Sequence, residues 1–380
     1  MQPDAGGVAN GGQSGVLQEL VAVSLLWAES GTRVARHFRA LVDERGGRTV
    51  LERPGAAREL FERVGRDMAP GASAGLAEMR AALARARLAL EQAASSGIAC
   101  VHVGQHEYPD RLWQIPDPPP VLWVLGRAEA LTSPAVAVVG ARQATPAGLS
   151  IATRLSRELA QAGLTVVSGL ARGVDGAAHK GALEAGGVTV AIQGCGPDLV
   201  YPREHTALAR RICESGTLAT EFPPGSQPLP WRFPLRNRVI SGLSRAVVVI
   251  EASDKSGSLI TARAALEQGR DVLAVPGSVA SGRYRGGHAL IKDGARLVET
   301  VEDVLEEIGW ARRALPAAGE ADKELIISNL ERIMAPGESY TLDDLAALTG
   351  QAAPALLAEL AALELAGRVV RVGGGNFAKT

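Results

Sequence analysis

Five short apolar runs, rich in β-branched residues, recur through the middle of this chain and are separated by helical stretches. The runs are VAVVG, LTVVSG, VTVAIQG, AVVVIE and DVLAVPG, all between Val136 and Gly277. Strands that alternate with helices in this way form a parallel sheet with helices packed on it. The sequence therefore predicts an α/β fold built on a mostly parallel sheet.

The residues before this region predict a small helical domain. Residues 1–15 are rich in glycine and are expected to form a flexible tail. In residues 16–97, apolar side chains recur at helical spacing, and a long Ala/Leu/Arg helix is expected from about Ala74 to Ala94. Because proline removes a backbone donor, the segment YPDRLWQIPDPPP at 108–120 is expected to be an extended connector rather than a helix or a central strand.

The chain length of 380 residues allows about two or three domains. We place the central domain at residues 98–310. An Ala/Gly/Pro-rich linker is expected at 311–321. Residues 322–380 are then expected to form three helices and a short β-wing.

Charge is distributed unevenly along the chain, although the formal net charge is only −1. Residues 1–130 hold 14 Lys and Arg against 15 Asp and Glu, residues 131–300 hold 19 against 13, and residues 301–380 hold 7 against 13. The middle therefore carries +6 and the C-terminal part −6. A basic central domain favours a polyanionic partner, and a chance imbalance on a solvated surface is the alternative.

Cysteine usage and hydropathy argue against a disulfide-rich, metal-binding, secreted or membrane-spanning protein. Cys100, Cys195 and Cys213 contain no CxxC pair, so we expect neither a disulfide framework nor a metal site. The sequence has no apolar run of 18 residues and no signal-peptide pattern at its start. A cytoplasmic protein without a membrane span is expected.

Ligands of parallel sheets bind beyond the carboxyl ends of the strands. The first such loop contains Gly140 and Arg142, an arginine suited to holding a phosphate. Two further glycine-rich loops, at 168–175 and 194–198, resemble phosphate cradles, but tight turns explain them equally well.

Two more loops add charge, aromatic rings and hydroxyl groups. The fourth, PWRFPLRNR at 230–238, combines three arginines with two aromatics, which is typical of sites that grip phosphates and stack bases. The fifth, KSGSLIT at 255–261, opens a helix with hydroxyl and amide donors, where an anion would fit.

On these motifs the chain resembles the DNA-processing protein A (DprA, or Smf) family. The matching segments, in order, are GAR at 140–142, SGLARGVDGAAH at 168–179, YPRE at 201–204, FPLRNRVISGLS at 233–244, EASDKSGSLITA at 251–262 and GRDVLAVPG at 269–277. The resemblance implies an extended Rossmann-like domain flanked by a helical SAM-like domain and a winged-helix-like domain. It further implies a homodimer that binds single-stranded DNA during natural transformation, helps the recombinase RecA displace single-strand-binding protein, and needs no cofactor or catalytic activity.

The resemblance also assigns roles to residues. It implies phosphate contacts for Arg142 and Arg203 and a base contact for Phe233. The expected DNA-binding set is Gly140, Arg142, Ser168, Gly169, Arg172, Arg203, Arg232, Phe233, Arg236, Asn237, Arg238, Lys255, Gly257 and Ser258. The expected dimer and RecA surface contains Leu266, His288 and Leu297. The chain departs from the family at Ala141, at Pro230, and at Arg285 with His288, and Arg232 is a candidate to replace the charge missing at Pro230.

Several of these residues also have structural interpretations. Asp175 and His179 are four apart at a helix start, and we expect the aspartate to cap the helix and the histidine to pack locally. Glu251 ends a strand, where we expect it to organise backbone amides. Phe233 is either a core aromatic or a stacking platform.

Three other functions are weaker. A nucleoside-monophosphate phosphoribohydrolase needs a PGGxGTxxE segment and a dinucleotide enzyme needs GxGxxG after a strand, and the chain has neither. A sequence-specific regulator would read bases through a helix-turn-helix-like segment at 341–367. Its second helix, PALLAELAALELA at 354–366, offers two glutamates and no basic residue, so protein contact or DNA contact through the wing alone is expected.

Overall fold

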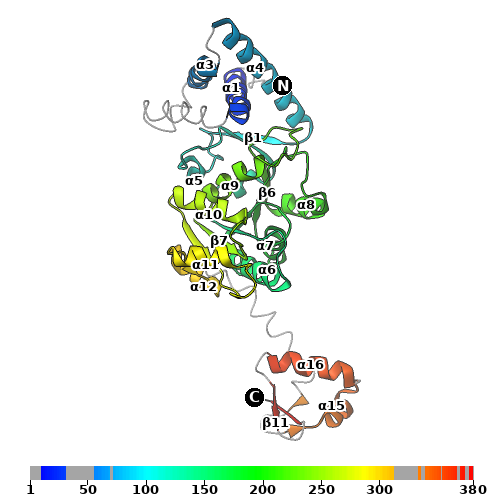
Figure 1. Ribbon diagram of the computed structural model, residues 1–380. Helices are drawn as coiled ribbons and strands as arrows, with labels where there is room; N and C mark the ends of the chain where they lie inside the picture. The colour runs from blue at the N-terminus through cyan, green and yellow to red at the C-terminus, as the bar shows by residue number, and fades with distance from the viewer. Residues whose placement is uncertain are drawn as a thin grey trace, which may run out of the picture. The chain divides into compact units, whose positions relative to one another are not determined.

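The computed structural model describes residues 10–30, 55–68, 72–311, 333–334, 339–351, 353–365, 369–372 and 376–379. The chain forms two compact units, residues 1–313 and residues 314–380. The first runs from blue to yellow in Figure 1 and the second from orange to red. Within the described residues, no helix has both the length and the apolar character needed to cross a bilayer.

A nine-stranded sheet forms the centre of the first unit, in the order β1-β2-β6-β5-β4-β3-β7-β8-β9 among the described residues. The strands are β1 (Ala99–His102), β2 (Val121–Gly126), β3 (Ala135–Gly140), β4 (Thr165–Ser168), β5 (Thr189–Ile192), β6 (Thr217–Thr220), β7 (Ala246–Ile250), β8 (Asp271–Ala274) and β9 (Arg296–Leu297). From β6 to β9 all pairings are parallel, whereas β1 and β2 are antiparallel to their neighbours. The predicted mostly parallel sheet is confirmed, and the five predicted runs are β3, β4, β5, β7 and β8.

Helices cover both faces of this sheet (Figure 1). They are α6 (Pro146–Gln161), α7 (Val174–Glu184), α8 (Thr206–Ser215), α9 (Arg232–Leu243), α10 (Ser258–Glu267), α11 (Arg285–Lys292) and α12 (Val301–Glu307). Successive side chains of a strand point to opposite faces. Val138 and Val248 accordingly join the core beneath α6 and α7, whereas Val247 and Val249 join the core beneath α9 and α10.

Three helices that precede the sheet in the sequence pack into the same core as α9 and α10. They are α1 (Asn10–Ser30), α3 (Ala56–Met68) and α4 (Ala72–Ser95), and α4 matches the predicted long helix. Buried Leu20 and Leu60 belong to the same apolar cluster as Leu122 of β2. Helix α1 already begins within the segment expected to be a tail, and residues 1–9 of that segment lie outside the described residues.

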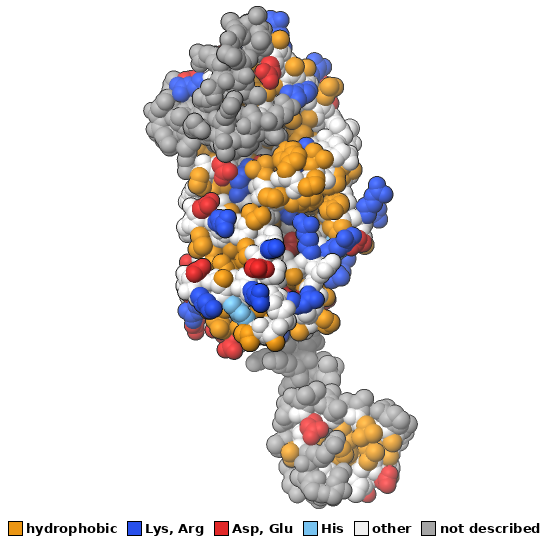
Figure 2. All heavy atoms as spheres, in the orientation of Figure 1, with side chains coloured by type: hydrophobic (Ala, Val, Ile, Leu, Met, Phe, Trp, Pro, Cys, Tyr) orange, Lys and Arg blue, Asp and Glu red, His pale blue; other side chains and the backbone are white. Residues whose placement is uncertain are grey.

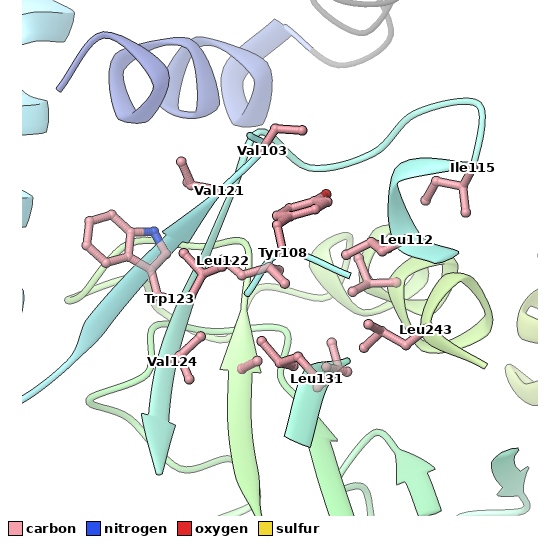
Figure 3. Close-up of a cluster of buried hydrophobic side chains, with 14 of the residues drawn as sticks. Val103, Tyr108, Leu112, Ile115, Val121, Leu122, Trp123, Val124, Leu131 and Leu243 are labelled. Carbon is pink, nitrogen blue, oxygen red and sulfur yellow. The ribbon is translucent and has the colours of Figure 1, made fainter. Parts of the chain in front are cut away.

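The connector at 108–120 contains a short helix, α5 (Asp110–Trp113), so the prediction of a wholly extended segment was wrong there. Pro109 occupies the N-cap, where a missing N–H costs nothing, and the next proline follows only at 116. Figure 3 shows the side chain of Tyr108 pointing into the apolar cluster beside this helix. Its hydroxyl donates to the carbonyl oxygen of Pro119 at 2.7 Å.

The second unit has the predicted β-wing. Its three-stranded antiparallel sheet, in the order β10-β12-β11, consists of β10 (Ser339–Tyr340), β11 (Val369–Val372) and β12 (Asn376–Lys379). Helices α15 (Leu342–Thr349) and α16 (Ala353–Leu365) lie between β10 and β11 in the sequence, and Leu345, Leu360 and Phe377 belong to the core of this unit. The first of the three expected helices and nearly all of the expected linker lie outside the described residues.

Candidate functional site

The order of the strands creates a crevice between β3 and β7. The chain proceeds from β3 through β4 and β5 on one side of β3, and β7 and β8 lie on the other side. Such a switch point leaves a ligand crevice at the carboxyl ends of the two strands. A cleft of about 490 Å³ opens there, lined by the loop after β3, the segment after β7 and the first turns of α9 and α10. We call it the switch-point cleft.

Gly140 allows β3 and β7 to close together at the base of this cleft. The amide of Ala141 donates to the carbonyl oxygen of Ile250 at 3.3 Å, and a Cβ on Gly140 would overlap that same oxygen. Although Gly140 lines the cleft, its missing side chain makes room for Ile250 and Val174 and not, as we expected, for a phosphate.

Arg142 and Phe233 form a cationic and aromatic wall of the cleft. The guanidinium carbon of Arg142 lies 5.6 Å from the centroid of the Phe233 ring, within the range of a cation–π contact. Arg142 is exposed, and among the described residues it makes no salt bridge with a carboxylate. The centroid of the Tyr201 ring lies 5.3 Å from that of the Phe233 ring. Phe233 is half-buried, so part of its ring remains open to a ligand.

Arg236 forms the floor beneath this wall. Its guanidinium is 4% exposed and donates to the carbonyl oxygens of Gly169, at 2.8 Å, and Ile192. Burial lowers the pKa of Arg236 to about 10, and the nearby carboxylate of Asp175 opposes that shift. Gly169 has no Cβ because the Arg236 guanidinium occupies its place. Arg236 therefore joins the loops after β4 and β5 and supplies positive charge from below.

The start of α10 supplies hydrogen-bond donors on the opposite side. Ser256, Gly257 and Ser258 line the cleft, and the two serine hydroxyls lie 2.7 Å apart. Open space surrounds the Cα of Gly257, so a ligand can approach the backbone there. The side-chain amide of Asn237 donates to the carbonyl oxygen of Gly257 at 3.4 Å. Amides at a helix start favour an anion.

Two buried acids near the cleft hold backbone amides. Asp175 accepts from the amides of Gly169 and Ala171 at 3.1 and 3.4 Å, so it organises the preceding loop rather than capping its own helix. Glu251 accepts from the amide of Thr145 at 2.7 Å, as expected of an acid that organises backbone.

Two family models match this chain. One, described as DNA recombination-mediator protein A, matches residues 99–309, and one described as the DprA winged helix domain matches residues 312–375. The chain belongs to the DNA recombination-mediator protein A (DprA) family. The resemblance inferred from the motifs is thereby confirmed, as are the Rossmann-like fold and the winged-helix domain.

Individual relatives agree with this assignment. Protein Smf of Escherichia coli strain K12 is 42% identical over 276 residues, which cover 70% of this chain and 74% of the relative. The solved structure of DNA processing protein A from Streptococcus pneumoniae has 34% identity and a TM-score of 0.56, over 77% of this chain and 94% of that one. DNA processing protein A from Helicobacter pylori, solved to explain its single-stranded DNA binding mode, has 28% identity and a TM-score of 0.51, over 56% and 95%.

The structure brings part of the predicted DNA-binding set together. The following members line the switch-point cleft: Gly140, Arg142, Phe233, Arg236, Asn237, Gly257 and Ser258. A small side pocket beneath Phe233 adds Gly169 and Arg172. Arg172 is already engaged, because its guanidinium donates to both carboxylate oxygens of Glu204, at 2.5 and 2.8 Å.

Five members line neither cavity. Ser168 is fully buried and its hydroxyl donates to the carbonyl oxygen of Val138. Arg238 is also buried and pairs with Glu221 at 2.6 Å and Asp117 at 3.1 Å. These two side chains serve the interior, which corrects our expectation that they face a ligand.

The other three lie outside the cleft. Arg203 and Lys255 are exposed, and Lys255 directly precedes Ser256 of the cleft lining. Arg232 lies over the rings of Phe222 and Trp231, at 4.7 and 5.1 Å. The segment holding Arg232 was expected to be a strand-end loop, but it forms the first turns of α9, because Pro230 and Pro234 lie where a helix tolerates them. Figure 2 shows Lys and Arg side chains surrounding hydrophobic ones on one face of this unit.

Sequence reasoning missed Arg283, which lines the switch-point cleft and donates to the carbonyl oxygen of Gln143 at 3.0 Å. Its place in the GRYRGG segment at 282–287, beside Arg285, was the only available signal. Of the expected dimer residues, Leu266 and Leu297 are 59% and 41% exposed. His288 is half-buried, within hydrogen-bonding distance of the Gly277 carbonyl oxygen (3.1 Å), and stacks on Tyr284.

Proposed function

We propose that the switch-point cleft binds single-stranded DNA and that the chain protects incoming strands during natural transformation. The observation that carries this proposal is the Arg142 guanidinium over Phe233, without a carboxylate partner among the described residues. A relative in the same family, from H. pylori, binds single-stranded DNA.

The chemistry of the cleft fits a strand of nucleic acid. The Arg142 fork and the first amides of α10 suit a phosphate, which prefers charged and preorganised donors. The open part of the Phe233 ring suits a base, since aromatic side chains stack on bases of any sequence. An unpaired base can reach that ring and a paired base cannot, so single strands are preferred.

The same proposal includes the mediator role implied by the family. The chain forms a homodimer through the surface around Leu266 and Leu297 and helps load RecA onto strands covered by single-strand-binding protein. It acts by binding rather than by catalysis. In support, both acids that line the cleft, Asp175 and Glu251, accept hydrogen bonds from backbone amides.

The test uses the full chain and fluorescent oligothymidine, with anisotropy measured across a salt series and against a duplex of equal length. We expect preference for the single strand and a steep loss of affinity with salt, because phosphate contacts release counterions. Equal affinity for both forms, or a flat salt response, would count against DNA binding at this cleft. Faster RecA filament formation on protein-covered strands tests the mediator role separately.

A further inference from the structure

A second cleft, of about 650 Å³, opens at the opposite edge of the same sheet. Pro134, just before β3, and Arg245, just before β7, lie on one side of it. The loop and helix that contain His106 and Arg111 form the other side. Because both strands begin here, this cleft is separated from the switch-point cleft by the length of β3. We call it the basic cleft.

Three arginines gather at this edge without ion pairs. Arg111 and Arg245 line the cleft, and Arg270, directly before β8, donates to the carbonyl oxygen of Arg111 at 2.8 Å. Within the described part of the chain, none of the three makes a salt bridge with a carboxylate. The Nε of Arg270 is buried and has no hydrogen-bond partner there. Unpaired guanidinium groups in a partly buried place are costly unless an anion joins them.

The electrostatics of the cluster agree with this view. Burial lowers the pKa of Arg111, and the neighbouring charge of Arg245 lowers it further, while Asp271 acts in the opposite direction. Burial and the charge of Arg111 likewise lower the pKa of Arg270. Asp110 also lines the cleft. Three guanidinium groups thus face two carboxylates, and the positive charge remains in excess.

We propose that the basic cleft binds a phosphate group, carried either by a free nucleotide or by a nucleic-acid backbone. Arginine forks match the geometry of phosphate oxygens. The polar side chains of Gln114, Thr132 and Ser133 also line the cleft and can complete the hydrogen bonding of such a ligand. This site is independent of the switch-point cleft and does not rest on the function proposed for it.

The alternative is that the arginines only neutralise helix ends. Helices α9 and α10 both end at this edge, and Arg245 and Arg270 follow them closely, where positive charge is favourable. That role does not explain Arg111, which belongs to α5 and lies across the cleft. It also does not explain an open cavity large enough for a ligand.

Fluorine NMR of the full chain labelled with 5-fluorotryptophan tests the proposal. The Arg245 guanidinium lies 5.3 Å from the Trp310 ring centroid, so the Trp310 resonance, assigned with Trp310→Phe, reports on this arginine. Inorganic phosphate, ATP and oligothymidine are titrated separately. The test variant is R111Q/R270Q, which keeps Arg245 beside the Trp310 reporter, and R210Q/R211Q, at two exposed arginines of α8, is the control with the same loss of charge.

We expect a saturable shift of the Trp310 resonance in the unsubstituted protein and in the control, and an affinity about tenfold or more weaker in R111Q/R270Q. A shift with inorganic phosphate or ATP shows that the cleft binds the phosphate of a free nucleotide. A shift with oligothymidine alone shows that it binds the phosphate of a nucleic-acid backbone. No shift with any of the three, or an affinity that R111Q/R270Q leaves unchanged, overturns the proposal. Oligothymidine anisotropy of the same variant shows separately whether the switch-point cleft still binds DNA.

Discussion

The guanidinium of Arg142 and the ring of Phe233 lie face to face, 5.6 Å apart, although 91 positions separate them in the sequence. A charged fork thus stands beside an aromatic surface at the point where the strand order reverses. The two groups bind different parts of a nucleotide, so their contributions to affinity can be separated by experiment.

We predict that Arg142→Ala weakens binding of single-stranded DNA by about 1–3 kcal/mol, whatever the base sequence, because a charge-assisted phosphate contact is lost. The salt slope of the affinity should flatten by about one phosphate. Arg142→Lys should restore only part of the affinity, since the planar fork is gone. Anisotropy titrations measure all three effects. Arg210→Ala, at an exposed site on α8, is the control, and an equal loss there would refute a specific role for Arg142.

We predict that Phe233→Ala costs about 1–3 kcal/mol of binding through lost base stacking and leaves the salt slope nearly unchanged. Phe222→Ala is the matched comparison, because Phe222 is 1% exposed and belongs to the interior. That variant should mainly lower the melting temperature. If Phe233→Ala behaves in the same way and the folded protein keeps its affinity, Phe233 is a core residue.

The sheet and the centre of the cleft were predictable because they follow from local patterns. Runs such as AVVVI are buried on both faces and leave little choice but a central parallel strand. Loops that follow neighbouring parallel strands meet at the carboxyl edge of the sheet. Placing the strands therefore also placed Arg142 and Gly257 at the same cleft. Strands β2 and β6 were missed: β6, TLAT, has only four residues with two apolar side chains, and β2 directly follows three prolines.

The roles of the arginines at 232–238 were not predictable while the segment was taken for a loop. On a helix, Phe233, Arg236 and Ile240 lie on one side, and these three line the cleft. Arg238 is two positions beyond Arg236, which turns it away toward Glu221. Arg283 was missed for another reason, since its contact with Gln143 joins loops 140 positions apart.

The buried ion pair of Arg238 and Glu221 gives a prediction about stability. Arg238→Ala should destabilise the fold by about 3–5 kcal/mol, because it leaves a buried carboxylate without its partner. The double variant R238M/E221L should recover most of that loss, since both charges are removed. Urea unfolding measures both. The DNA affinity of the folded R238A protein should stay unchanged. A loss of affinity without a loss of stability would show that Arg238 contacts DNA.

His179 makes the stability of the fold depend on pH. Its Nδ1 lies 2.7 Å from the Thr189 hydroxyl, which donates to the carbonyl oxygen of Val166, so Nδ1 carries a proton and donates to Thr189. Burial lowers the pKa of His179 from 6.5 to about 3, with His205 and Arg236 adding to the shift.

Between these two pKa values, His179 binds a proton in the unfolded chain but not in the folded chain. The free energy of unfolding therefore falls as the pH drops from 6.5 toward 3. At about pH 5 this costs about 2 kcal/mol. We predict that the free energy of unfolding declines less steeply over this range in His179→Gln than in the unsubstituted protein. Parallel pH slopes in urea titrations would show that His179 does not titrate in this way.

Two exposed leucines, one on α10 and one on β9, give the last prediction. Leu266 of α10 and Leu297 of β9 are 59% and 41% exposed, and β9 ends the sheet with an unpaired edge among the described residues. Exposed large apolar side chains and an open strand edge each favour association with another chain. We predict a homodimer that L266E/L297E converts to a monomer, because two buried carboxylates per subunit would lack partners.

The control variant is Leu88→Glu, at a leucine of α4 that is 64% exposed, and it should leave the dimer intact. Sedimentation velocity at micromolar concentration distinguishes the states, and a monomer before any substitution refutes the dimer itself.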